Sequence, residues 1–289
     1  MKRIFALLIS VILLASAAAC SEGSTDGGSG AGDGSNIGAG SGGIKSPADF
    51  AGKKIAVQDE TTADESIALM IDDGMDIDVF RYPQVINCFD DLKIGRVDAV
   101  YVDSVVAAFY TTGSTEYQRV WLSDEAEPLG ICLDKNSENL LAAIEAAVDT
   151  LYYNGEMANI SRKHFGEDLT AGLRNVTSEP VIPPVSDDDL RTPGVFSVGA
   201  DIGYPPMEYY DRDGTTPIGF DIDVGKAIAE LLGLEHKVID TAWDGIFDSV
   251  ERGDFDCIMS SVSITVPRQQ RHLLTQPYVA NALCIVVKN

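Results

Sequence analysis

Two stretches of this chain alternate apolar strands with amphipathic helices in the same order, and this alternation limits the fold more than any other feature. The first stretch runs over residues 51–103 and the second over residues 195–261. Short strands separated by helices of about ten to fifteen residues predict parallel sheets whose faces are covered by helices. We therefore expect an α/β fold with two lobes, each built on a mainly parallel sheet flanked by helices.

Each stretch ends with a polar residue directly after a buried strand. The segment "GRVDAVYVD" closes on Asp103, and "GDFDCIMSS" closes on Ser261. Ligands of parallel sheets bind beyond the carboxyl ends of the strands, so we expect both side chains to face one cleft between the lobes. A carboxylate buried at such an edge needs a partner. The sequence leaves two options open, because Asp103 could meet a ligand or could only cap the helix that begins near Ser104.

The charge of the chain excludes several functions. Its 289 residues carry 45 acidic and 21 basic side chains, for a net charge of −24. Nucleic-acid binding requires clustered Lys and Arg, so we do not expect a nucleic-acid partner. The three histidines are scattered, and no Cys/His pair has metal-ligand spacing. No metal and no cofactor is expected.

The amino terminus has the layout of an export signal. Lys2 and Arg3 precede an apolar stretch, and a run of small residues leads into Cys20. A cysteine at this place resembles the lipobox of bacterial lipoproteins. The resemblance implies that residues 1–19 are removed and that lipid on Cys20 anchors the chain to the outer face of the cell membrane. Plain secretion with an incidental cysteine is the alternative. Residues 20–43 are rich in Gly and Ser and would form a flexible tether.

Four further cysteines lie outside the signal region. Their even number permits disulfides, but spacing alone does not show them. Three of the four occupy apolar, strand-like runs, so buried free thiols are the expectation, and a Cys132–Cys284 bridge remains the alternative. The four are Cys88, Cys132, Cys257 and Cys284.

Several segments resemble one protein family. The segment "SVGADIGYPPMEYYDRDGTTPIGFDIDVGKAIAELLG" resembles the start of the first lobe of the bacterial extracellular solute-binding proteins of family 3, the amino-acid receptors of ABC importers. The segment "WDGIFDSVERGDFDCIMSSVSITVPRQQRHLLTQPYV" is similar to the continuation of that lobe. "FAGKKIAVQDETT" and "DDLKIGRVDAVYVDSVVAAFY" resemble the second lobe, and "LYYNGEMANISRKHFG" resembles the carboxyl-terminal helix of the family. The family implies a two-lobed periplasmic-binding-protein type II fold.

The order of these segments differs from the usual order of the family, in which the first lobe precedes the second. The chain therefore reads as a circular permutation, with new ends opened at a hinge crossing and one hinge strand fewer. A monomer is expected, and a dimer that exchanges halves is the alternative. The expected division is a second lobe at 44–128, a return strand and carboxyl-terminal-type helix at 129–167, a linker at 168–191 and the first lobe at 192–289. Within the return segment we expect one helix over 137–166 with a break at Asn154–Gly155.

The resemblance also implies which residues bind the ligand. An amino acid is a zwitterion, so both of its charges need partners when it leaves water. Arg268 matches the carboxylate-binding arginine of the family, with Ser263 as a further donor. Asp103 would accept the ammonium group with help from Ser261. Thr61 and Thr62 open a helix, for which we expect Thr62 as the N-cap and Glu65 as its capping-box partner. The free N–H groups of this helix also favour an anion. Each of these residues has a structural alternative, since Arg268 could be exposed and the two threonines could only cap the helix.

Four further residues would form the walls around the ligand side chain. Tyr204 and Trp243 match positions at which the family places aromatic rings, and Asp201 matches a position that contacts polar or cationic groups. Glu60 stands where the family commonly has glycine, and it would add negative charge if it turned inward. Aromatic faces and carboxylates together suit a cation, so we expect a polar or basic amino acid.

The expected function is a membrane-anchored lipoprotein that captures an amino acid and delivers it to the permease subunits of an ABC importer. We do not expect an enzyme. One alternative is a lyase of the same fold, similar to a cyclohexadienyl dehydratase, with Glu60 or Asp201 as the acid or base. Another is a sensory module that reports ligand binding to a membrane signalling partner.

Overall fold

The structure is a computed structural model that describes residues 43–289. The expected signal peptide, Cys20 and nearly all of the expected tether lie outside the described residues. The described part belongs to one compact unit and is an α/β fold with two five-stranded sheets and a small hairpin. None of its helices has both the length and the apolar character needed to cross a membrane.

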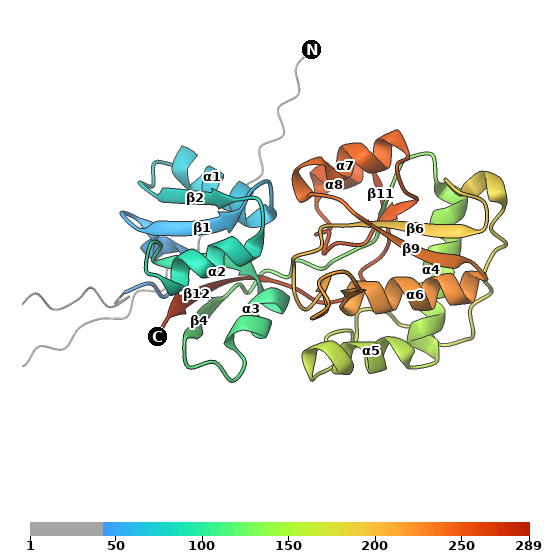
Figure 1. The fold of residues 1–289 in the computed structure, drawn as a ribbon, viewed down its shortest axis with the longest axis horizontal. Helices are drawn as coiled ribbons and strands as arrows, with labels where there is room; N and C mark the ends of the chain where they lie inside the picture. The colour runs from blue at the N-terminus through green and yellow to red at the C-terminus, as the bar shows by residue number, and fades with distance from the viewer. Residues whose placement is uncertain (1–42) are drawn as a thin grey trace, which may run out of the picture. The chain divides into compact units, whose positions relative to one another are not determined.

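The first sheet carries helices α1–α3 in its connections (Figure 1). Its strand order is β2-β1-β3-β12-β4. The first strand is parallel to its two neighbours, whereas the last strand of the chain lies antiparallel between two others. The bounds are β1 (Lys54–Gln58), α1 (Thr62–Asp72), β2 (Asp78–Tyr82), α2 (Val85–Lys93), β3 (Ala99–Asp103), α3 (Ser104–Thr111), β4 (Tyr117–Leu122) and β12 (Leu283–Lys288), after a 3₁₀ turn at Pro47–Phe50.

The second sheet repeats this order as β9-β6-β10-β5-β11. Strand β6 is parallel to both of its neighbours, β9 and β10, and β5 lies antiparallel between β10 and β11. The bounds are β5 (Cys132–Leu133), α4 (Glu138–Tyr153), α5 (Glu156–Phe165), β6 (Val195–Ala200), α6 (Phe220–Leu232), β9 (Glu235–Asp240), α7 (Trp243–Arg252), β10 (Cys257–Ile258), α8 (Val266–Arg271) and β11 (Leu273–Leu274), with a 3₁₀ turn at Asp187–Asp189 and a hairpin of β7 (Tyr209–Tyr210) and β8 (Pro217–Ile218).

The two sheets exchange strands. After β4 the chain crosses to the second sheet and supplies β5, and after β11 it crosses back and supplies β12. The two crossings, residues 123–131 and 275–282, bond to each other through their backbones, for example from Leu129 N to Val279 O at 3.2 Å and from Tyr278 N to Leu129 O at 3.0 Å. The sheets are thus joined by two paired segments.

This exchange corrects two expectations. The sequence division placed all of 192–289 in one lobe, but β12 pairs with β3 and β4 of the other sheet. The expectation that the chain end opens a hinge crossing is wrong, because both crossings are continuous. The apolar run of β12 is buried at all residues except Lys288, and this pattern predicts a central strand without showing which sheet receives it.

Helix boundaries confirm one expectation and correct another. The break at Asn154–Gly155 is confirmed, since α4 ends at Tyr153 and Gly155 adopts a left-handed φ of 81° before α5. The amino-terminal cap of α1 is Thr61, whose side chain accepts a hydrogen bond from Asp64 N, and not Thr62 as expected. The capping box with Glu65 is therefore absent from this helix.

The segment between α5 and β6 is docked against the rest of the fold by Arg174. Its side chain is only 2% exposed, and its guanidinium bonds Glu145 and Asp149 of α4. It also donates to the carbonyls of Gln276 and Pro277 at the start of the second crossing. This segment therefore contacts the connection between the sheets directly.

The four described cysteines are buried free thiols. Cys132 lies in the second sheet and Cys284 in the first, so the structure contains no Cys132–Cys284 bridge. Burial raises the pKa of both thiols to about 12. They act as small apolar side chains in the two cores.

Truncation of Ile285 tests whether β12 holds the first sheet together. Ile285 is fully buried between Tyr101 of β3 and Trp121 of β4. Ile285→Ala should lower the free energy of unfolding by about 2–5 kcal/mol, because it leaves a cavity in this sheet. Urea unfolding measures the change. Gln118→Ala on the exposed face of β4 is the control and should change stability by less than about 0.5 kcal/mol. A similarly small effect of Ile285→Ala would contradict the central role of β12.

Candidate functional site

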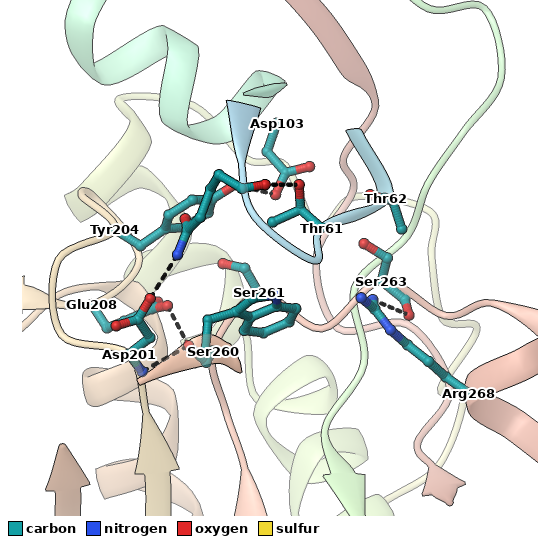
Figure 2. Close-up of a pocket in the computed structure, with 12 residues that line it drawn as sticks. Thr61, Thr62, Asp103, Asp201, Tyr204, Glu208, Ser260, Ser261, Ser263 and Arg268 are labelled. Carbon is teal, nitrogen blue, oxygen red and sulfur yellow. Dashed lines mark hydrogen bonds between the residues drawn. The ribbon is translucent and has the colours of Figure 1, made fainter. Parts of the chain in front are cut away.

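A cavity lies at the carboxyl ends of strands from both sheets, and Figure 2 shows the residues around it. This is the edge at which parallel sheets bind ligands. Every site residue expected from the sequence lines the cavity except Glu60. The lining residues are Gln58, Thr61, Thr62 and Asp103 from the first half of the chain, and Asp201, Tyr204, Glu208, Trp243, Ser260, Ser261, Ser263 and Arg268 from the second.

Asp103 is the last residue of β3, and its side chain turns into the cavity. It precedes α3 but forms no side-chain cap bond with that helix. Instead its carboxylate accepts hydrogen bonds from Tyr204 OH at 2.7 Å and from Asn281 Nδ2 at 2.6 Å. Burial, and then the charge of Glu127, raises the pKa of Asp103 to about 7. The carboxylate is thus destabilised in its charged form and has no cationic partner within bonding distance among residues 43–289.

Arg268 projects from α8, whose first turn is capped by Thr265. Its guanidinium carbon lies 5.4 Å from the ring centre of Trp243 and 5.1 Å from that of Phe247, distances typical of cation–π contacts. Nη1 donates to the carbonyl of Ser263 at 3.1 Å. Burial lowers the pKa of Arg268, although an arginine remains charged in proteins. Within the described residues this guanidinium forms no ion pair, so a cation with unused donors lines the cavity.

Glu127 links the two halves at the cavity wall and was not identified from the sequence. It lies in the first crossing, and its Oε1 accepts hydrogen bonds from Thr62 Oγ1 and Ser263 Oγ. Both hydroxyls therefore already donate to Glu127. The acidic run "DEAEP" contains Glu127 but gives no sign of this contact.

The other end of the cavity is acidic. Burial raises the pKa of Asp201 to about 6, and its Oδ2 accepts a hydrogen bond from Gln58 Nε2 at 2.8 Å. Glu208 Oε1 accepts from Ser260 Oγ at 2.7 Å, whereas its Oε2 is buried without a hydrogen-bond partner among the described residues. Burial and the charge of neighbouring Asp221 raise the pKa of Glu208 well above its usual range. The charged form of Glu208 is therefore disfavoured at this place.

Asp221 lies beside Glu208 at this acidic end and accepts two hydrogen bonds. Tyr278 OH donates to its Oδ1 at 2.6 Å, and Ser261 N donates to its Oδ2 at 3.0 Å. Ser261 holds a left-handed φ of 51°, which is uncommon for a residue with a side chain, and its buried Oγ has no partner among the described residues. This conformation presents an unused hydroxyl to the cavity (Figure 2).

Glu60 differs from its expected position. Its side chain lines a separate outer cavity together with Arg271 and His272, so it does not add charge around the ligand side chain. Its backbone is used instead, since the Glu60 carbonyl accepts a hydrogen bond from Trp243 Nε1 at 3.1 Å. The residue has a φ of 59°, a region that favours glycine. The left-handed turn is thus formed by a glutamate at some cost in strain.

Further hydrogen bonds join the two halves of the chain at the cavity. They connect Gln58 to Asp201, Tyr204 to Asp103 and Trp243 to Glu60. The structure therefore describes a closed cleft. Sequence reasoning missed Gln58, Glu208 and Ser260, although Gln58 ends a parallel strand just as Asp103 does, and the same edge rule would have selected it. Within the described chain, no group of three or more His, Cys, Asp or Glu side chains could hold a metal ion.

The raised pKa of Asp103 predicts a pH dependence of stability. Between pH 4 and pH 7 the folded protein keeps a proton on Asp103 that the unfolded chain has lost, so the free energy of unfolding should fall as the pH rises through this range. Asp103→Asn should remove this part of the slope, which amounts to about 1.4 kcal/mol per pKa unit. Urea unfolding of ligand-free wild type and variant at pH 4, 5, 6, 7 and 8 measures the difference. A wild type that gains stability over the variant with rising pH would contradict the assignment.

Comparisons with known proteins find similarity in the last third of the chain. Residues 196–289 match the model of the family described as bacterial extracellular solute-binding proteins, family 3. The chain is 30% identical over 99 residues to the L-cystine-binding protein TcyJ of Escherichia coli K12, and 33% identical over 98 residues to the histidine-binding periplasmic protein of Salmonella typhimurium LT2. Each match covers 34% of this chain, and the chain spans only 37% of the length of these relatives.

A solved structure matches the same proportion of the chain. The arginine-bound form of domain 1 from TmArgBP is 31% identical, covers 33% of this chain and 81% of that chain, and has a TM-score of 0.29. The family match over residues 196–289 contains eight of the cavity residues, namely Asp201, Tyr204, Glu208, Trp243, Ser260, Ser261, Ser263 and Arg268. Through this segment, the chain is similar to the bacterial extracellular solute-binding proteins of family 3.

Proposed function

We propose that this chain binds a free amino acid in the cavity between its two halves and delivers it to an ABC importer outside the cytoplasm. One observation carries the proposal. An unpaired guanidinium, Arg268, and a buried carboxylate, Asp103, line the same cavity from different halves of the chain. These are the two partners that a small zwitterion requires when it is removed from water.

The proposed binding mode uses these two charges. The α-carboxylate of the ligand would take the free donors of Arg268 in a bidentate arrangement, which arginine favours. The free N–H groups at the start of α1, at Thr61 and Thr62, would assist it. The ammonium group would bond Asp103, and the unused hydroxyl of Ser261 is a further acceptor. The proposal thus assigns a partner to groups that the fold leaves unsatisfied.

The acidic end of the cavity supports a polar or basic ligand side chain. Asp201 and Glu208 line this end, and a negatively charged side chain would be repelled there. The named ligands of the relatives agree with a polar or charged amino acid, since those proteins bind cystine, histidine and arginine. Tyr204 and Trp243 would contact the aliphatic part of such a side chain.

We propose a receptor and not an enzyme. Of the two residues considered as an acid or base, Glu60 lines a different cavity and Asp201 is bonded to Gln58. A lyase would need such a group over the reacting carbon of the ligand. Some similar proteins are named as enzymes, among them an ancestral cyclohexadienyl dehydratase and a membrane-bound lytic murein transglycosylase F, so the recovery of unchanged ligand is part of the test.

We further propose that the chain acts as a lipoprotein, with lipid on Cys20 and a Gly/Ser tether, and that its lobes are circularly permuted. The matched order of the two sheets supports the permutation, because each sheet takes its antiparallel strand from the other half. Arg174 holds the segment that would join the former chain ends against α4 and the second crossing. A monomer is the simplest form, since both crossings and both cavity walls are supplied by one chain.

A thermal-shift and calorimetry panel of the twenty amino acids tests the binding function. A ligand at a hundredfold excess over its Kd should stabilise the protein by about 2.7 kcal/mol. Arg268→Ala and Asp103→Ala should weaken binding by about thirtyfold or more, because each leaves a buried ligand charge unpaired. Arg271→Ala, on the same helix, should bind normally. Normal binding by both cavity variants would show that the site lies elsewhere, and product formation would favour the lyase.

Cellular fractionation tests the lipid anchor. The wild type should appear in the membrane fraction of a bacterial host, and its amino-terminal peptide should carry diacylglycerol by mass spectrometry. Cys20→Ser should remove the lipid and release the protein from the membrane, because a single change removes the attachment site. Cys88→Ser, at a buried thiol, should stay on the membrane. Unchanged membrane association of Cys20→Ser would contradict the proposal.

A further inference from the structure

Gln58 reaches across the cleft and occupies the acidic end of the cavity. It is the last residue of β1 and is 6% exposed. Its Nε2 donates to Asp201 Oδ2 at 2.8 Å on the far side of the cleft and to Pro83 O at 3.1 Å on its own side. Both hydrogens of the amide are therefore used, and the two bonds fix the position of the side chain.

Asp201 depends on this amide. The carboxylate accepts no other side-chain hydrogen bond among residues 43–289, and the charges that act on it come from Asp240 and Asp244. Its backbone N–H donates to Ser260 Oγ at 3.0 Å, and the Ser260 hydroxyl in turn donates to Glu208. A neutral amide thus supplies the compensation that a cation would otherwise give.

A long cationic side chain would compete with Gln58 for Asp201. The amide already occupies Asp201 Oδ2, and both residues line the cavity proposed to hold the ligand. A cation that takes this oxygen would displace the amide and leave it without that partner. A short side chain would end before this contact and leave it intact.

We propose that Gln58 determines specificity in the amino-acid site: its bond to Asp201 across the closed cleft favours short, uncharged polar amino acids over lysine and arginine. This inference rests on the proposed binding function. It selects one of the two ligand classes, polar and basic, that the acidic end of the cavity allows. The fold positions the selector on the half of the chain opposite to Asp201, so selection takes effect when the cleft closes.

The test compares ligand rankings of wild type and variants by calorimetry, with serine, threonine, asparagine, lysine and arginine as probes. Wild type should bind at least one of the first three more tightly than lysine or arginine. Gln58→Ala should shift the ratio of affinities toward lysine and arginine by about tenfold to a hundredfold, because Asp201 becomes free to pair with the cation. Gln58→Ala combined with Asp201→Asn should lose this gain. Gln118→Ala, an exposed glutamine on β4, should keep the wild-type ranking.

The outcomes separate this inference from the proposed function. If wild type binds amino acids but Gln58→Ala keeps the same ranking, the inference is overturned and the binding function stands. A wild type that prefers lysine or arginine also overturns the inference. If no amino acid binds wild type, the proposed function fails and the inference fails with it. Should Gln58→Ala not fold, Gln58→Asn replaces it, because its amide is one methylene shorter and cannot reach Asp201 in this cleft.

Discussion

The exchange of one strand between the two sheets is the constraint on which the rest of the structure depends. Because β12 completes the first sheet and β5 completes the second, neither half can bury its core without the other half of the chain. The two crossings that carry these strands are bonded to each other. They bring the carboxyl ends of both parallel strand sets to one place, and the cavity forms there. The position of the site is therefore a consequence of the strand exchange.

The charges in this cavity are arranged as incomplete pairs. Arg268 contacts two aromatic rings and a carbonyl but no carboxylate among the described residues, while Asp103 is buried with only neutral donors. Charges in this state cost folding free energy, and a zwitterionic ligand would supply the missing partner of each. The raised pKa of Asp103 reflects this cost.

The carboxyl groups at the acidic end of the cavity differ, because they accept hydrogen bonds from side chains of the protein itself. Burial and Asp221 raise the pKa of Glu208, and the Asp201 carboxylate is bonded by an amide from the opposite half. The ends of the cavity therefore differ in what they leave to a ligand. In the proposed binding mode, the two opposite charges would bind the backbone atoms of an amino acid, whereas Gln58 already occupies the side-chain end.

Residues at strand ends were predictable, and residues that act through distant partners were not. The alternation of strands and helices indicated two parallel sheets, and the edge rule placed Asp103 and Ser261 in one cleft. The family resemblance supplied Arg268, Tyr204 and Trp243. Gln58 ends β1, so the edge rule would have selected it, but no local pattern shows its bond to Asp201, which is 143 residues away. Glu60 was expected among the ligand-binding residues, yet it lines another cavity, and only the hydrogen bond from Trp243 shows that its carbonyl is the group in use.

The sequence by itself determined the α/β class, the helix break at Asn154–Gly155 and the chemical types available at the strand ends, because periodicity, capping and glycine placement are local properties. Only the tertiary structure decided that β12 belongs to the first sheet, that Thr61 and not Thr62 caps α1, and which side chains meet across the cleft. Apolar runs have the same pattern whichever sheet they enter, and hydrogen bonds between distant residues depend on how the two halves close. Strand membership and the pairing of buried charges are therefore set by the fold as a whole.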